Sequence, residues 1–224
     1  MAISQETIDL TNRRLKTPRA AAIAGILFAM LFSTSIVLIR LSIPSGPGDQ
    51  GAWLENQASR VSLALSLFPF AGIAFLWFIG VIRDLLGEYE DRFFSTVFFG
   101  SGLLFLGMTF GAAAIAGGIL VSYSVDLGTF SQGGAYTIGR AVMYQISNVY
   151  GIRMAGVFML SLGTIWVRTQ LMPRPLILLT YGVALVMLLS ISLSLWMTLI
   201  FPGWVFAVSV YILIRNYSSS QQSL

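Results

Sequence analysis

Long apolar runs separated by short polar segments dominate the chain. Three of these runs cover residues 20–39, 61–82 and 93–121, and a fourth ends at Val167 without a clear start. A bilayer core about 30 Å thick is crossed by roughly 20 apolar residues in a helix. The pattern therefore predicts at least four membrane-spanning helices.

The last apolar run is almost twice as long as one span requires. No charged residue occurs over 176–214, and a Phe-Pro-Gly-Trp sequence lies inside this run at 201–204. Proline and glycine together are typical of a turn, and tryptophan is enriched at membrane interfaces. We expect a hairpin of helices over 176–199 and 203–215, which makes about six spans. The alternative is five spans, with one long span and a re-entrant piece in this run.

The two ends of the chain are more polar than its middle. Residues 4–15 mix apolar and charged side chains, which is typical of a short helix on the membrane surface. Pro18 suits the first turn of the first span, because a proline there loses no hydrogen bond. We expect 1–19 to be a cytoplasmic amphipathic segment, 20–215 to be a single transmembrane helical domain, and 216–224 to be a disordered tail.

The composition strengthens the assignment to a membrane. Of the 224 residues, 56% are hydrophobic and 10% are charged, and the mean hydropathy is +0.82. An ordinary soluble domain carries about 25% charged residues, so this chain has too few to cover a soluble surface. We expect an all-α, polytopic integral membrane helix bundle.

Basic residues are concentrated on one predicted side of the membrane. Nine of the 13 lysines and arginines lie on the side of the two termini. Because basic residues are enriched in cytoplasmic segments, we expect both termini to be cytoplasmic and the protein to be a multi-pass component of the cell membrane. These nine residues are Arg13, Arg14, Lys16, Arg19, Arg83, Arg92, Arg168, Arg174 and Arg215.

Histidine and cysteine are absent from the chain. Histidine is the usual general base near neutral pH, cysteine is a common nucleophile, and both are frequent ligands of zinc and haem. Their absence argues against an enzyme, a bound metal and a cofactor. The net charge of +4 comes mainly from the arginines that set the topology, so we expect no nucleic-acid binding.

Small residues recur at helical spacing in two predicted spans. Close packing of membrane helices depends on such residues. Two interpretations are open from the sequence. The small residues contact other helices of the same chain, or they form an interface with a second copy of the chain or with another membrane protein. The candidate packing residues are Ala21, Gly25 and Ala29 in the first span and Gly107, Gly111 and Gly118 in the third.

The loop after the second span holds a large share of the charge. Its acids can pair with basic residues of the cytoplasmic side or form a patch that docks a partner; the alternative is a solvated loop that sets the topology. Surface ion pairs by themselves add little stability. The residues of this cytoplasmic charge cluster are Arg83, Asp84, Glu88, Glu90, Asp91 and Arg92.

The outer segment before the fourth span contains the main candidates for a polar pathway. Polar side chains recur every three or four positions over 137–151, including Arg140, Tyr144 and Asn148, and therefore share one face of a helix. This amphipathic helix lies on the outer surface or lines a polar cavity, in which Arg140 would attract anions. The loop that precedes it contains Asp126, the last acidic residue of the chain.

Arg153 is the remaining candidate. In a span near 148–167 it lies about one turn inside the outer end. A charge at that depth is costly unless its side chain reaches the interface or finds a partner. We expect Arg153 either to extend toward the outer surface or to pair with an outer acid.

Two classes of function are compatible with these features. The first is a small channel or facilitator for an ion or polar solute, and it predicts a path lined by the polar face of 137–151 or by Arg153. The second is a non-catalytic accessory, scaffold or sensor subunit, and it predicts a solid bundle with a separate exposed patch. The polar features on the outer side of a glycine-rich bundle favour the first class.

Overall fold

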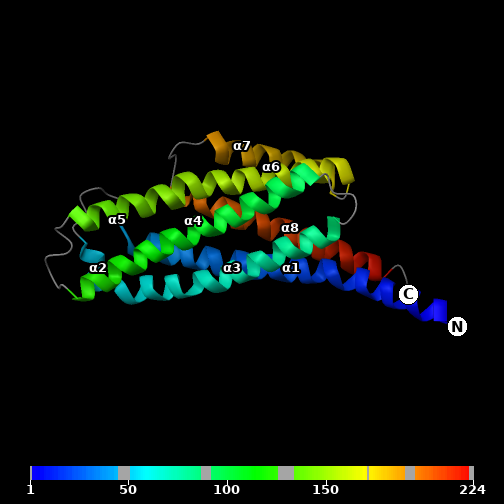
Figure 1. Ribbon diagram of the computed structural model, residues 1–224, viewed down its shortest axis with the longest axis horizontal. Helices are drawn as coiled ribbons and strands as arrows, with labels where there is room; N and C mark the ends of the chain where they lie inside the picture. Colours follow the sequence, from blue (N-terminus) through cyan, green and yellow to red (C-terminus); the bar gives the residue numbers. More distant parts are fainter. Residues whose placement is uncertain are drawn as a thin grey trace.

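The chain folds into an elongated bundle of helices (Figure 1). The part that the structure describes is helical and contains no strand, which confirms the predicted all-α class. The computed structural model describes residues 2–44, 51–86, 92–125, 134–170, 172–189 and 195–221.

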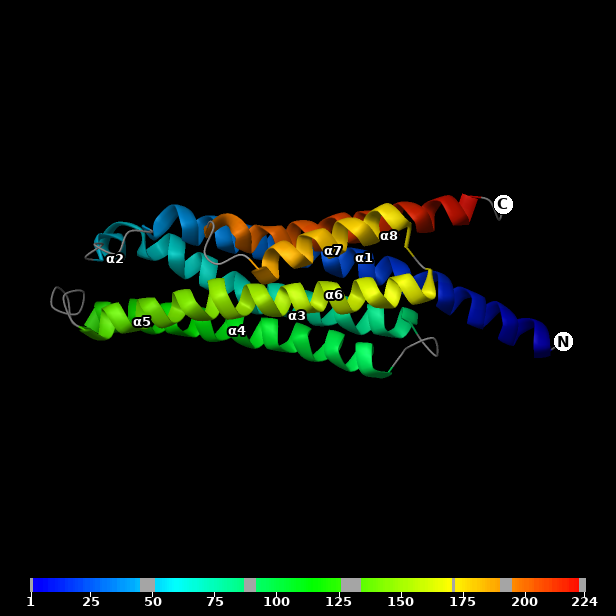
Figure 2. The ribbon, with the colours of Figure 1, turned by 90° about the horizontal axis from the view of Figure 1, so that it is seen from above.

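The long helices run along the long axis of the bundle and alternate in direction (Figure 1). Both chain ends lie at one end of the bundle, here called the termini end, and α2 and α5 lie at the other, here called the distal end (Figure 2). In chain order the elements are α1 (Ala2–Ser42), α2 (Ala52–Asn56), α3 (Ala58–Leu86), α4 (Arg92–Val125), α5 (Gly134–Gln145), the π-helical segment η3 (Ile146–Gly151), α6 (Ile152–Thr169), α7 (Arg174–Leu189), the 3-10 segment η4 (Leu195–Leu199) and α8 (Ile200–Gln221).

Within the described residues, five helical stretches are long and apolar enough to cross a membrane. The sixth apolar helix, α7, has 16 residues and is therefore about 24 Å long. It packs along α6, whereas α8 packs along α1. This is the architecture of a multi-pass membrane protein. The five stretches are Arg19–Ser42, Ala58–Asp84, Phe93–Val125, Gly134–Thr169 and Trp196–Arg215.

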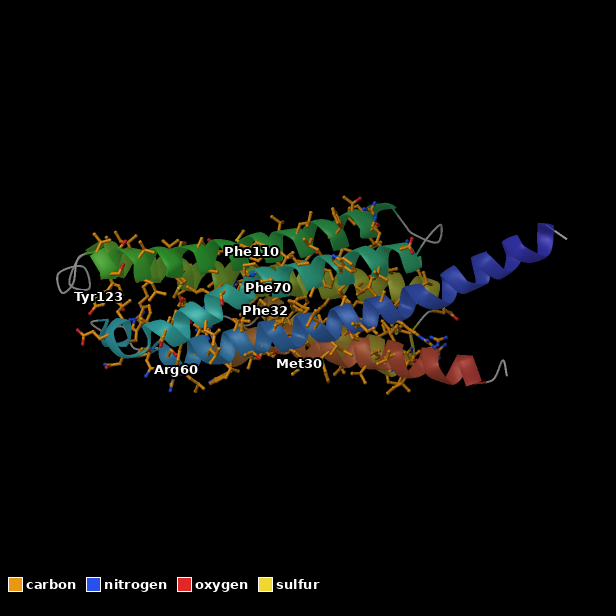
Figure 3. The ribbon with its side chains drawn as sticks, turned by 90° about the horizontal axis from the view of Figure 1, so that it is seen from below. Met30, Phe32, Arg60, Phe70, Phe110 and Tyr123 are labelled. Carbon is orange, nitrogen blue, oxygen red and sulfur yellow. The ribbon has the colours of Figure 1, made fainter. Side chains whose placement is uncertain are left out.

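Large apolar side chains cover the outside of the bundle. Met30 of α1 and Phe70 of α3 lie in its middle part and point outward (Figure 3), with 59% and 61% of their surfaces exposed. Pro69, beside Phe70, does not interrupt α3. Such a surface is suited to contact with lipid, since soluble proteins rarely expose large contiguous apolar patches.

The turn predicted in the last apolar run falls inside a helix. α7 ends at Leu189 and η4 begins at Leu195, whereas 201–204 belongs to the first turns of α8. Pro202 is the third residue of α8, where its missing N–H breaks no intrahelical hydrogen bond. The run does contain two helices, but the predicted turn at 201–204 was wrong.

Three predicted boundaries also differ from the observed helices. α1 continues from Ala2, so 4–15 is its N-terminal part and not a separate surface helix, and α8 continues to Gln221, into the expected disordered tail. Neither segment contains a glycine, and the single Pro18 removes only one donor from the helix. The predicted amphipathic helix over 137–151 is present, but α5, η3 and α6 join it to the fourth span as one helical run.

Aromatic rings fill the middle of the bundle. Phe75 of α3 is fully buried, and its ring centroid lies 4.6 Å from Phe28, 5.4 Å from Phe158 and 5.6 Å from both Phe105 and Phe201. These partners belong to α1, α6, α4 and α8. Because edge-to-face and offset ring contacts add stability beyond area burial, this aromatic cluster ties five helices together.

The small residues of α1 pack inside the chain. Ala21 and Ala29 are buried. A Cβ atom at Gly25 would lie 2.0 Å from Ser209 Oγ and 2.8 Å from a ring carbon of Phe78. The glycine therefore lets α1 approach both α8 and α3 closely.

The small residues of α4 have the opposite surroundings. A Cβ atom at Gly107, Gly111 or Gly118 would meet no other atom within 4 Å. Ala114 is exposed, and Gly100 also has open space beside it. We call these residues, which recur every three, four or seven positions, the α4 stripe: Gly100, Gly107, Gly111, Ala114 and Gly118.

Candidate functional site

A cavity of about 80 Å³ lies in the distal half of the bundle, where α1, α3, α4, η3 and α8 meet. Its walls are mainly apolar, and a space of this size holds a few water molecules or one small ion. The side chains that bring polar atoms to it are Arg40, Thr109, Tyr144, Ser147, Asn148 and Thr198.

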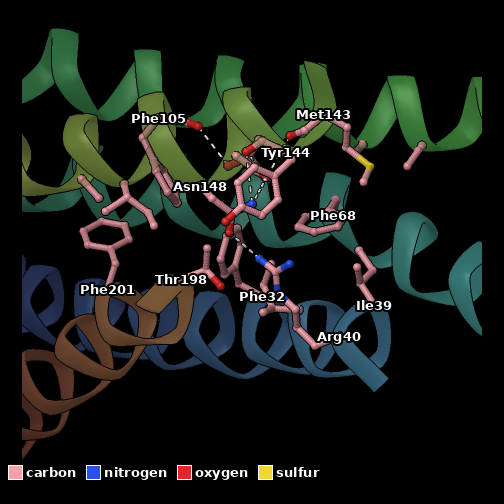
Figure 4. Close-up of a pocket in the computed structure, with 18 of the residues that line it drawn as sticks. Phe32, Ile39, Arg40, Phe68, Phe105, Met143, Tyr144, Asn148, Thr198 and Phe201 are labelled. Carbon is pink, nitrogen blue, oxygen red and sulfur yellow. Dashed lines mark hydrogen bonds between the residues drawn. The ribbon is translucent and has the colours of Figure 1, made fainter. Parts of the chain in front are cut away.

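Among the described residues that line this cavity, Arg40 alone is charged. It belongs to the last turn of α1 and extends toward Tyr144 and Asn148 on the opposite side (Figure 4). Its Nη2 donates to Asn148 Oδ1 at 2.5 Å. The Asn148 Nδ2 in turn donates to the Tyr144 carbonyl at 3.1 Å and to Ser147 Oγ at 2.8 Å.

The Arg40 guanidinium has more donors than this network uses. A guanidinium carries five N–H groups. Arg40 Nε is buried without a hydrogen-bond partner, and no carboxylate of the described residues pairs with the group. A half-buried cation whose only side-chain acceptor is a neutral amide favours a negative or strongly accepting ligand beside it.

The π-helical segment η3 positions Asn148. A π-helix inserts one extra residue per turn, and such segments are frequent at functional sites. Ser147 Oγ accepts from Asn148 and donates to the Met143 carbonyl at 2.9 Å, which fixes the polar edge of the segment. Gly151 ends it, and a Cβ there would lie 3.3 Å from the Ile146 carbonyl oxygen. The absence of a side chain at Gly151 thus accommodates the wide turn.

The cavity ends against the aromatic cluster. Four phenylalanines line its wall, and the Phe105 and Phe201 ring centroids are 4.7 Å apart. Phe32 lies 5.6 Å from both Phe68 and Phe105. Among the described side chains, Phe105 and Phe201 lie on the side of the termini end and form an apolar floor there (Figure 4).

The structure brings two of the predicted pathway residues, Tyr144 and Asn148, to the cavity. The predicted helix over 137–151 therefore lines a cavity with part of its polar face. Arg140 lies about two turns closer to the distal end than Asn148 does. Its guanidinium donates to the Pro44 carbonyl. It is not among the residues that line this cavity, so the role of Arg140 in a pathway stays a prediction.

Arg153 is also outside the cavity wall. It is half-buried, and its Nη1 donates to the Val149 carbonyl of its own helix at 3.0 Å. The side chain thus turns back toward the distal end, as expected for a charge near an interface. Asp126 lies outside the described residues.

Sequence reasoning missed Arg40 as a site residue; it is one of the four basic residues that the predicted topology leaves on the outer side, with Arg60, Arg140 and Arg153. Phe32, Ile36 and Arg40 are spaced by four, and the first two are buried. Residues four apart share one face of a helix. This spacing was the available signal that Arg40 faces the bundle.

At the termini end, two arginines lie over aromatic rings of α4. The Arg83 guanidinium carbon is 5.2 Å from the Phe99 centroid, and that of Arg168 is 4.8 Å from the Phe94 centroid. Asp84 of the cytoplasmic charge cluster is exposed. Glu88, Glu90, Asp91 and the side chain of Arg92 lie outside the described residues, so the ion-pair network stays a prediction.

Comparison with known proteins adds no functional assignment. No protein-family model, no curated protein and no solved structure matches the chain. Within the described residues, no group of three or more acidic side chains is placed to hold a metal ion. The chemistry of the cavity is the strongest guide to function.

Proposed function

We propose that this protein is a cell-membrane facilitator, with cytoplasmic termini, for a small anion or a small polar solute that accepts hydrogen bonds. The observation that supports this proposal is the position of Arg40 in a polar-edged cavity, with donors beyond its bond to Asn148. No catalytic step is part of the proposal.

The cavity offers a suitable set of binding groups. A cation in a low-dielectric environment attracts an anion much more strongly than it does in water. The side chains of Tyr144, Ser147 and Thr198 line the same wall and carry hydroxyl groups. The volume of about 80 Å³ restricts the ligand to a small species such as a halide or a one-carbon acid.

Passage through the bundle requires movement of the aromatic floor. Phe105 and Phe201 line the cavity on the side of the termini end (Figure 4). The proposal is therefore a gated facilitator that binds its solute before releasing it, with saturable flux, and not a permanently open pore. Polar groups that mark a substrate path commonly face the interior of a helix bundle in this way.

The test is flux into proteoliposomes that contain the purified full chain. Chloride, nitrate and formate are the anionic probes, and formamide, a one-carbon amide, is the neutral probe. We expect saturable flux for at least one probe and a loss of about tenfold or more in Arg40→Gln, since hydrogen bonds to charged groups contribute about 1.5–3 kcal/mol. The matched control, Arg153→Gln, removes an arginine that bonds only its own helix and should change flux less than about twofold.

Either of two results contradicts the proposal. One is the absence of flux above protein-free liposomes for all four probes. The other is an equal loss of flux in Arg40→Gln and Arg153→Gln, because that would indicate a general effect of positive charge and not a site at Arg40.

A second candidate function rests on the α4 stripe. Its glycines are open on the outside of the bundle, whereas Gly25 of α1 is packed inside. Open small-residue faces allow close approach of another membrane helix. This observation favours an accessory or scaffold subunit that associates through α4 with a second copy of the chain or with another membrane protein.

A further inference from the structure

We infer that the groove between α6 and α7 at the termini end binds one anionic phospholipid, with the lipid phosphate at Arg174. The groove has a volume of about 490 Å³, within the usual range of ligand sites. It is formed by the end of α6 and the start of α7 (Figure 2). The lining residues that matter are Trp166, Gln170, Arg174, Ile177, Leu178 and Tyr181.

The walls of the groove are apolar and well anchored. Trp166 is 1% exposed, and its ring centroid lies 5.9 Å from that of Trp204. Tyr181 Oη lies within hydrogen-bond distance of Thr164 Oγ1, at 3.0 Å, which ties α7 to α6. Leu178 is 72% exposed, so the groove is bordered by surface that faces lipid and not the bundle interior.

Arg174 supplies the charge of the groove. It is exposed, and it has no hydrogen bond, ion pair or ring contact with any residue in the described part of the chain. It is also the first residue of α7, where the helix dipole adds partial positive charge. An anionic group at this position therefore meets two sources of positive potential.

The combination of charge and apolar wall selects an anionic phospholipid over a free anion. Basic pockets between transmembrane helices bind acidic lipid head groups, and aromatic residues near them lie at the interface. The phosphate interacts with Arg174, and the upper acyl chain lies along Ile177 and Leu178.

Arg168 provides a matched control at the same end of the same hairpin. It is exposed like Arg174 and is six residues away in the chain. Its guanidinium already lies over the Phe94 ring of α4, and it does not line the groove. Comparing variants of the two arginines therefore distinguishes lipid binding at a specific site from a general effect of the positive charge at this end.

The test uses the purified full chain in a mild detergent and counts bound lipids by native mass spectrometry. The probes are phosphatidylglycerol, phosphatidylcholine and inorganic phosphate. We expect one phosphatidylglycerol to bind more tightly than phosphatidylcholine. Arg174→Gln should weaken it about fivefold, consistent with the usual attraction of one arginine to an anionic lipid surface, while Arg174→Lys and Arg168→Gln should weaken it less than twofold.

Three outcomes would overturn the inference. The first is equal binding of the two lipids, and the second is equal weakening by Arg174→Gln and Arg168→Gln. The third is displacement of phosphatidylglycerol by inorganic phosphate at a concentration similar to that of the lipid, because the acyl chain would then add nothing to binding. Circular dichroism of each variant confirms that the bundle is intact. Since the Arg40 cavity shares no lining residue with the groove, failure of this test leaves the proposed transport function unaffected.

Discussion

Arg40 and Asn148 are 108 residues apart in the chain, and a hydrogen bond between their side chains joins α1 to the π-helical segment η3. The bond crosses a cavity in the interior of an otherwise apolar bundle. It places the charge of Arg40 beside a neutral amide. This arrangement distinguishes the site from a closed ion pair, because the positive charge stays available to a ligand.

Coupling between these two residues is measurable as a free energy of unfolding. We expect Asn148→Leu to cost about 1–3 kcal/mol, because it leaves the half-buried guanidinium without its side-chain acceptor. Arg40→Leu removes the charge itself and should cost less. In the double variant the losses should be smaller than the sum of the single losses. Unfolding in mixed detergent micelles gives the four values, and additive losses would contradict the coupling.

The buried glycine of α1 should be sensitive to a single methyl group. Gly25→Ala places a Cβ into Ser209 and the fully buried Phe78, and overpacking of this kind costs about 1–3 kcal/mol. Gly107→Ala adds the same methyl group to open space on α4 and should be neutral or slightly stabilising, because alanine favours helix more than glycine does. Thermal unfolding of the two variants in detergent provides the comparison, and equal melting temperatures would show that α1 does not pack as described.

Association through the α4 stripe should depend on its small side chains. Gly107→Ile and Gly111→Ile add bulk to the stripe at positions where an added Cβ meets no other atom within 4 Å. We expect them to lower the oligomeric state or to release a copurifying membrane protein. Gly182→Ile on α7 is the control, since it also points into open space but lies outside the stripe. Light scattering after size-exclusion chromatography detects the change, and an equal effect of Gly182→Ile would exclude a specific interface.

The orientation in the membrane can be mapped with single cysteines because the chain contains none. Ser59 is exposed at the distal end, and Ser220 lies near the end of α8 at the termini end. The distribution of basic residues predicts that an impermeant thiol reagent labels Ser59→Cys in intact cells. Ser220→Cys should be labelled only after permeabilisation. The reverse pattern would contradict cytoplasmic termini.

The membrane class and most helix positions follow from the sequence, because they depend on local properties. An apolar run of about 20 residues predicts a spanning helix wherever it occurs, and the runs at 20–39, 61–82 and 93–121 all lie within observed helices. The three- and four-residue spacing over 137–151 likewise predicted one polar helix face. Tyr144 and Asn148 could therefore be identified as candidates from the sequence alone.

The ends of the helices were harder to predict from the sequence. The Pro-Gly pair at 202–203 is typical of a turn. Pro202 nevertheless lies in the first turn of α8, where proline is tolerated. Buried Trp204 donates to the Thr180 hydroxyl and so binds this turn to α7. Such a contact between helices overrides the local preference for a turn.

Only the tertiary structure decided which groups share a site. Arg40 and Arg140 look alike in the sequence as outer arginines, but one extends into the cavity and the other bonds the Pro44 carbonyl. The small residues of α1 and of the α4 stripe have similar spacing, but Gly25 of α1 meets neighbouring helices, whereas the glycines of the stripe face open space. The sequence by itself determined the membrane class, the positions of most apolar helices and the polar face of 137–151. Which face meets which depends on how the helices are rotated and packed, and that is set by contacts between segments distant along the chain.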